Sequence, residues 1–421
     1  MKRNQLKQYF QRSEEDYTPS LETVSLEEDQ MEISGAEAEM ADAEEVVDEL
    51  EDAADGLESI SEALSASLEN GGLDPQSSHF MAMATASYTN RLGLDSTLPS
   101  LESFGGESDR EEATKVSLEA VSDYIKKIWE AIKSAIQKAI KAMTDLFAKV
   151  FGGAAKLEKA AQSLAKAAND AKGSAQEDKI SISNISQLHI KGKYEAGDIL
   201  DGLKNTQEVL DYLYGDYADD AAKWYQEIGK ALADSSVKAS DDADEVDKDM
   251  AKFSEDFLKA LADMGKKFGS TELPGGKSVA IEVKSDDNGL SAVDAPSISS
   301  NGGEAPNSGE IDTPSLADVK KMAEGVESIA KTIQSKKKAV ESLDKAREDA
   351  LKAADKFVQD GDGGKLGKAW DKAKITLTLR SLNKGLARPV AQVSSMGFST
   401  GRAVLMVGKK AVEAYGEEKK D

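Results

Sequence analysis

The sequence contains no cysteine, only eight prolines and few aromatic residues, which make up 5% of its 421 positions. Without cysteine the chain has no disulfide bonds, thiolate metal sites or cysteine nucleophiles. No run of about 18 apolar residues occurs, so no segment is typical of a membrane-spanning helix. The basic start, Met1 to Leu6, has no apolar stretch behind it, and we expect no secretion signal. An apolar content of 39% favours helices with narrow apolar stripes over a thick sheet sandwich.

Acidic residues dominate, and they are unevenly distributed. The net charge of −25 argues against a simple nucleic-acid-binding protein, which needs a cationic contact face. Residues 1–102 contain 24 acidic and 5 basic side chains, which leaves a net charge of only −6 for the rest. An amphipathic helix fits residues 36–68, but self-repulsion and few large apolar groups favour disorder or folding on a partner. We therefore predict that residues 1–102 form a largely disordered, propeptide-like acidic arm.

Beyond Gly106 the apolar residues recur every three or four positions, which predicts helices. The clearest stretch is 123–151, which we expect to end at Gly152 and Gly153. Thinner or interrupted patterns predict further helices over 154–171, 196–233, 242–268, 315–359 with Ser315 as its cap, and 366–415 with an interruption near Pro389.

Three short stretches alternate with period two and predict strands. Residues 179–183 and 187–190 suggest a short hairpin or an edge strand. Residues 278–283 suggest a further strand, and a linker rich in Ser, Gly and Pro follows up to Pro314. The predicted fold is mainly α, an extended multi-helix assembly with a small β-hairpin insertion and the acidic arm. Its segments are 1–102 (arm), 103–270 (helical domain), 271–314 (β-hairpin and flexible linker) and 315–421 (C-terminal helical region).

Known catalytic and metal-binding motifs are missing. The two histidines, His79 and His189, have no second ligand at metal-binding spacing and are interpreted as surface or packing residues. Residues 274–278 imitate the end of a phosphate loop but fit a hairpin turn better, and residues 286–289 and 360–363 fit solvated turns better than calcium loops. The sequence predicts no catalytic, cofactor or metal site, and hence no enzyme.

The helix predicted over 123–151 is the best candidate for an interaction face. Its apolar stripe contains Ile125, Trp129, Ile132, Ile136, Ile140 and Phe147, and its lysines Lys126, Lys127, Lys133, Lys138 and Lys141 are candidate basic contacts. Such a helix either packs against neighbouring helices or lies on a membrane. Packing is favoured, because several other striped helices in the chain need a partner.

The tripeptide Ser-Leu-Glu occurs five times, always within the first 119 residues: it begins at positions 20, 25, 67, 100 and 117. Accessible, extended segments are where processing proteases cut. The copy at Ser100 to Glu102 lies where acidic, low-complexity sequence changes to regular helix. The segment from Pro99 to Gly106 is therefore the best candidate for a proteolytic site.

Residues 98–153, with Ser100-Leu101-Glu102 and the helix that begins Asp123-Tyr124-Ile125-Lys126-Lys127-Ile128-Trp129, resemble the internal head, or prohead core, proteins of large tailed bacteriophages. The resemblance implies a non-enzymatic protein that is packaged inside the capsid and cut near its N-terminus, after a small residue, any residue and Glu. Cleavage is then expected after Glu102, with Glu69 and Glu119 as alternatives. It also implies a location inside the virion head, after assembly from the host cytoplasm. The implied partners are the phage prohead protease, capsid or other core proteins, and packaged DNA after processing, but not a membrane.

Two other functions remain open at this stage. One is a membrane-active injected protein that uses the 123–151 helix, and the other is a helical adaptor or chaperone with the acidic arm as a solubilising tail.

Overall fold

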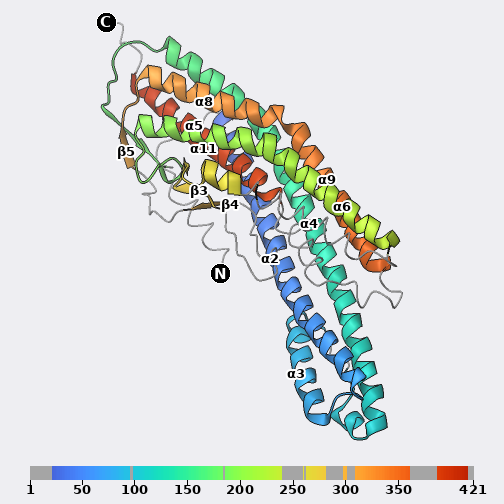
Figure 1. Ribbon diagram of the computed structural model, residues 1–421. Helices are drawn as coiled ribbons and strands as arrows, with labels where there is room; N and C mark the ends of the chain where they lie inside the picture. The colour runs from blue at the N-terminus through green and yellow to red at the C-terminus, as the bar shows by residue number, and fades with distance from the viewer. Residues whose placement is uncertain are drawn as a thin grey trace.

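A computed structural model describes residues 21–94, 98–183, 185–238, 259, 262–280, 297–300, 309–360 and 386–415. Within this part of the chain the fold is mainly α, built from long helices with two small β-sheets, and it is elongated (Figure 1). The predicted fold class is confirmed. Residues 242–258, 286–289 and 361–385, for which we predicted helices and turns, lie outside the described residues, as do residues 1–20.

The longest elements are α2 (Leu21–Glu69) and α4 (Glu107–Asp170), which run side by side. At a rise of about 1.5 Å per residue they are about 70 Å and about 95 Å long. Lys156 of α4 contacts Asp29 near the start of α2, and Thr114 contacts Leu73 just beyond its end, so the pair is antiparallel. In the chain, α2 and α4 are connected by α3 (Pro75–Arg91) and the short 3-10 turn η1 (Leu101–Phe104). This connection lies at an end of the molecule that projects beyond the other helices (Figure 1).

Two parts of the predicted arm are folded instead of disordered: residues 21–69 and 75–91 form the helices α2 and α3, which pack on the rest of the chain. Ile33, Met40 and Val47 of α2 recur every seven residues and are buried, with Leu57 and Leu64 continuing the stripe. A seven-residue apolar repeat is the pattern of a helix that packs along another helix. Of the two alternatives left open for this segment, disorder and folding on a partner, α2 follows the second, and its partner is α4 of the same chain.

The expected end of the central helix at Gly152 and Gly153 is also wrong, because α4 continues through both glycines to Asp170. A Cβ atom at Gly153 would lie 2.6 Å from Cε2 of Phe398, whereas none would meet an atom within 4 Å at Gly152. Gly153 therefore serves close helix packing. The low helix propensity of Gly153 is outweighed by the close contact with Phe398 that the glycine permits.

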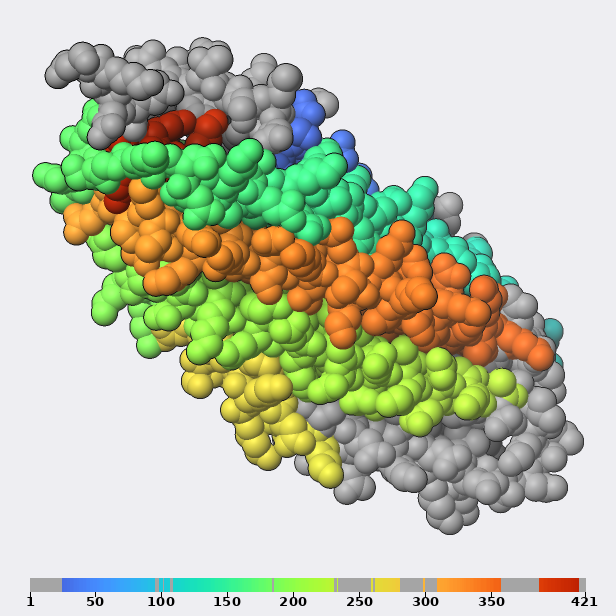
Figure 2. All heavy atoms as spheres, turned by 90° about the horizontal axis from the view of Figure 1, so that it is seen from above, coloured from blue at the N-terminus to red at the C-terminus, as the bar shows by residue number. Residues whose placement is uncertain are grey.

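A layer of paired helices covers the other side of α4. Helices α8 (Leu316–Ser335) and α9 (Lys337–Asp360) run antiparallel to α4, and α5 (Ala196–Tyr212) and α6 (Ala218–Lys238) run alongside them. Figure 2 shows α8 and α9 as one band between α4 and the α5–α6 band. The helix predicted over 315–359 is interrupted at Lys336, and the one predicted over 196–233 contains a π-helical turn, η3 (Leu213–Tyr217). Ser315 caps α8 as predicted, by accepting a hydrogen bond from the backbone N–H of Asp318.

Helix α11 (Arg388–Tyr415) lies between α4, α5 and α8 and is buried over most of its length. Pro389 does not interrupt this helix but stands at its beginning, where a missing N–H costs no helical hydrogen bond. Gly397 faces Ile329 and Gly401 faces both Leu157 and Val326. Side chains at these glycines would push the neighbouring helices apart.

The strands pair differently from the predicted short hairpin. β1 (Lys179–Ile182) pairs antiparallel with β5 (Gly309–Asp312), more than a hundred residues later, while part of 187–190 belongs to a 3-10 turn, η2 (Ile185–Gln187). The second sheet has the order β2 (Glu272–Leu273), β3 (Lys277–Ala280) and β4 (Ser297–Ser300). Its β2–β3 turn, at Gly275 and Gly276 with positive φ angles, confirms the hairpin interpretation of residues 274–278.

Candidate processing site and interaction surfaces

Glu102 lies in η1, in the connection between α3 and α4 at the projecting end of the molecule. Its side chain is exposed, and its carbonyl oxygen accepts a hydrogen bond from the N–H of Gly105 at 3.3 Å. No side chain caps this short turn. A second backbone hydrogen bond runs from the N–H of Ser103 to the carbonyl oxygen of Ser100 at 3.0 Å. Opening so short a turn is a small barrier to extending the chain into the cleft of a protease.

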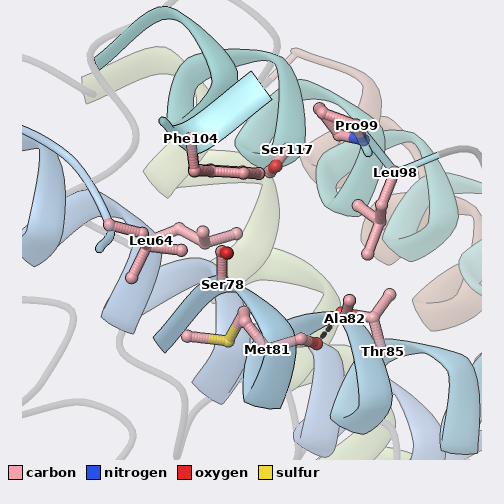
Figure 3. A pocket seen from close by; sticks show the side chains of 10 residues that line it. Leu64, Ser78, Met81, Ala82, Thr85, Leu98, Pro99, Phe104 and Ser117 are labelled. Atoms are coloured by element: carbon pink, nitrogen blue, oxygen red, sulfur yellow. Dashed lines mark hydrogen bonds between the residues drawn. The ribbon is translucent and has the colours of Figure 1, made fainter. Parts of the chain in front are cut away.

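Two apolar anchors flank the turn. Leu98 and Pro99 before it and the buried Phe104 after it line a small hollow, together with Leu64 of α2 and Met81 of α3 (Figure 3). The guanidinium Nε of Arg110 donates a hydrogen bond to the carbonyl oxygen of Phe104 at 3.2 Å. Cleavage after Glu102 therefore requires local opening of this end of the molecule, while the distant helix contacts stay intact.

The two alternative sites differ in backbone structure. Glu69 is the exposed last residue of α2, and the turn that follows is closed by a hydrogen bond from Gly72 N–H to the Ser67 carbonyl oxygen at 2.8 Å. Glu119 is exposed as well but lies inside α4, where extending the backbone would break the helix. Of the three predicted positions, Glu119 lies inside a long helix, Glu69 ends one, and Glu102 lies in a short turn between two helices.

The predicted interaction face on α4 is turned inward. Five of its six residues are buried, and the sixth, Ile125, is partly buried: the five are Trp129, Ile132, Ile136, Ile140 and Phe147. In this central part α4 is apolar on more than one side, because α2 lies against one face and α8 and α9 against another. The face is occupied by the chain's own helices, as expected from the packing alternative, and offers no free surface for a membrane.

The candidate basic contacts fall into two groups. Lys126, Lys127, Lys138 and Lys141 are exposed, whereas Lys133 is partly buried and forms an ion pair with Asp355 of α9 at 2.9 Å. The hydrogen bond that Lys133 donates to Asp355 raises the pKa of Lys133. Lys133 is therefore a structural residue, and the other four remain accessible.

The acidic helix α2 is bound to α11 by polar contacts that the sequence argument missed. Glu44 pairs with Arg388 at 3.3 Å and Glu27 pairs with Arg402 at 3.6 Å. Between them, Glu37 forms a hydrogen bond with Ser395. The three residues of α11 are spaced seven apart, so these contacts follow one face of an antiparallel helix pair. Burial raises the pKa of Glu37, against the smaller lowering effects of Ser395 and of the charge of Lys277.

The sequence signal for these polar contacts is the position of Glu37 and Glu44 beside the apolar stripe of α2. Carboxylates seven residues apart, next to buried apolar positions, indicate a polar partner on the facing helix. The identity of that partner could not be found by pattern, because α11 lies more than 300 residues later in the chain.

The two histidines behave as packing and surface residues, as interpreted. His189 is buried, its Nδ1 accepts a hydrogen bond from Gly192 N–H at 3.1 Å, and burial lowers its pKa. His79 is exposed on α3. Over the described ranges, no group of three His, Cys, Asp or Glu side chains is arranged to hold a metal ion. No helix in the same part of the chain is long and apolar enough to cross a bilayer.

The family of the chain is decided by a match that covers most of its length. The family model for phiKZ-like phage internal head proteins matches residues 26–410. The chain belongs to this family. It is therefore a protein of the interior of a phage head, and the match includes the acidic helix α2 as well as the body that follows Glu102. No curated protein and no solved structure matches this internal head protein significantly.

Proposed function

We propose that this internal head protein is a non-enzymatic structural component that is made as a precursor and cut after Glu102 during head maturation. The observation that carries the proposal is the placement of Ser100-Leu101-Glu102: it lies at a short turn between two helices, with Ser100 and Glu102 exposed, at the boundary between acidic and mixed-charge sequence. A prohead protease would find its substrate segment there without having to unwind a long helix.

The cut divides the chain's charge. Residues 1–102 hold a net charge of −19 and residues 103–421 hold −6. While the two parts stay together, the strongly anionic surface opposes binding to DNA; once the acidic part is lost, that repulsion falls. Loss of the acidic part during head maturation suits an interior protein that must stay soluble during assembly and later lie among packaged DNA.

Exposed lysines of α4 are the proposed contacts after maturation. Lys126, Lys127, Lys138 and Lys141 belong to a stretch, 126–166, with nine lysines and three acidic residues. Phosphate neutralisation by such side chains is independent of nucleotide sequence, which suits a protein surrounded by packaged DNA. Capsid or core proteins are the other proposed partners.

The test is the N-terminus of the protein in mature heads. Mass spectrometry and N-terminal sequencing should find Ser103 as the first residue, and Glu102→Gln should abolish this terminus. Glu119→Gln is the matched control, since it alters the same tripeptide within α4 and should leave processing unchanged. Mature heads in which residues 1–102 are still covalently joined to the body would refute the proposal.

A further inference from the structure

The acidic helix α2 lies in a groove whose walls have the opposite charge. Over its 49 residues α2 has 18 acidic and no basic side chains. The facing stretch of α4, 126–166, has a net charge of +6, and α11 has four basic residues and one acidic residue. In a chain with a net charge of −25 these are concentrations of positive charge, and four of the basic side chains contact α2: Lys149 and Lys156 of α4, and Arg388 and Arg402 of α11.

Specific contacts fix α2 in the groove along its N-terminal half. On the α11 wall Arg388 and Arg402 pair with Glu44 and Glu27. On the α4 wall Lys156 donates a hydrogen bond to Asp29 at 2.8 Å, and Lys149 donates one to the carbonyl oxygen of Glu32 at 3.3 Å. The groove thus recognises both the charge and the register of the helix.

The floor of the groove is apolar. Ile33, Met40 and Val47 of α2 are nearly inaccessible to solvent and belong to the same apolar cluster as Met143 and Val150 of α4. The C-terminal half of α2 continues the packing along α4 through Leu57 and Leu64. The contacts of Ile33, Met40 and Val47 do not involve the turn at Glu102, which lies near the other end of α2, where Leu64 and Phe104 line the same hollow.

We propose that, after the cut at Glu102, the acidic segment stays docked in the α4–α11 groove as a separate peptide, and that this groove is a binding site for an acidic amphipathic helix. This inference rests on the proposed processing. Cleavage then breaks the covalent link between the acidic segment and the body of the protein but leaves their contacts in place. The change in net charge comes later, when an event such as a rise in ionic strength weakens the ion pairs and releases the segment.

The experiment separates retention from processing by using an engineered cut. A recognition sequence for a site-specific protease is inserted between Pro99 and Ser100 of the full chain, and the purified protein is cut and passed over a sizing column. At physiological salt the two parts should co-elute, and at about 1 M salt, where the Debye length is about 3 Å, the acidic part should be lost. Separate elution at physiological salt overturns the proposal, whatever is found for Ser103 in mature heads.

Matched variants test the groove itself. The Arg388→Gln/Arg402→Gln pair should release the cut segment at least several-fold faster, whereas Lys138→Gln/Lys141→Gln removes the same charge at exposed positions of α4 and should have a much smaller effect. A labelled peptide of residues 21–69 should exchange into the cut protein, and a scrambled peptide of the same composition should not. Equal release by the two double variants, or equal binding of the scrambled peptide, would show that no specific site exists.

Discussion

Glu44 of α2 and Arg388 of α11 lie more than 300 residues apart in the chain, yet a carboxylate oxygen of Glu44 is 3.3 Å from a guanidinium nitrogen of Arg388. The side chain of Glu44 is only 8% exposed and that of Arg388 is 36% exposed. The pair joins the acidic segment to the last helix of the fold. A buried carboxylate next to a half-exposed arginine is costly to leave without its ion pair.

The first prediction concerns this pair. Arg388→Met should lower the free energy of unfolding by about 1–3 kcal/mol, because it removes a cation next to a buried carboxylate. Glu44→Met/Arg388→Met should cost less than the sum of the single substitutions, by about 1 kcal/mol. Urea denaturation of the four proteins measures both quantities. Additive effects would mean that the two side chains do not interact in solution.

The second prediction concerns pH. Asp344 of α9 accepts a hydrogen bond from Thr144 of α4 at 3.2 Å, and burial raises the pKa of Asp344 to about 6, against the lowering effect of the Arg347 charge. Between about pH 4 and pH 6 the carboxyl group of Asp344 is therefore protonated in the folded state and ionised in the unfolded state. This residue's contribution to stability is greatest below that window and is lost as pH rises through it.

Replacing Asp344 by Asn should remove this dependence. Relative to the unaltered chain, Asp344→Asn should gain stability between pH 4 and pH 7, by about 1–3 kcal/mol at pH 7. Thermal or urea unfolding at a series of pH values measures the difference. Asp349→Asn, an exposed position on the same helix, is the control and should show little change. A pH-independent difference for Asp344→Asn would contradict the raised pKa.

The third prediction compares two adjacent glycines of α4. Gly153→Ala should destabilise the fold by about 1–3 kcal/mol, because the new methyl group would meet the ring of Phe398, which is fully buried and cannot move aside cheaply. Gly152→Ala should stabilise it by about 0.5–1 kcal/mol, since the position is open and alanine favours the helix. Urea unfolding of the two variants should show changes in the free energy of unfolding that have opposite signs. Equal changes would exclude the close α4–α11 contact.

The fourth prediction concerns access to the processing site. A Cβ atom at Gly56 of α2 would lie 2.1 Å from the ring of Tyr88 of α3, so Gly56→Ala should displace α3 and loosen the end of the molecule that holds Glu102. Limited proteolysis near residues 98–106 should become faster. Gly35→Ala, which adds a methyl group in open space on the same helix, should leave the rate unchanged. No acceleration in Gly56→Ala would indicate that α3 does not restrain the turn.

Local sequence was a good guide wherever a helix carried its own wide apolar stripe. The stretch 123–151 was recognised as a helix because its large apolar residues recur at helical spacing, and Ser315 was recognised as a cap because its side chain acts within one turn. Local sequence was a poor guide where the packing or pairing partner of a segment lies far away in the chain. Lys179–Ile182 has the alternation of a strand, but nothing nearby indicates that Gly309–Asp312 is its partner.

The helical class, the concentration of acid in the first hundred residues, the absence of thiol chemistry and the position of the Ser-Leu-Glu tripeptides can all be read from the amino-acid sequence, because composition and periodicity are local properties. Three other features follow from packing: the acidic segment folds against α4 and α11, Gly153 continues a helix instead of ending it, and the stripe around Trp129 is covered. These outcomes depend on the free energy of contacts between distant segments, and in α2 that energy outweighs the self-repulsion of 18 carboxylates.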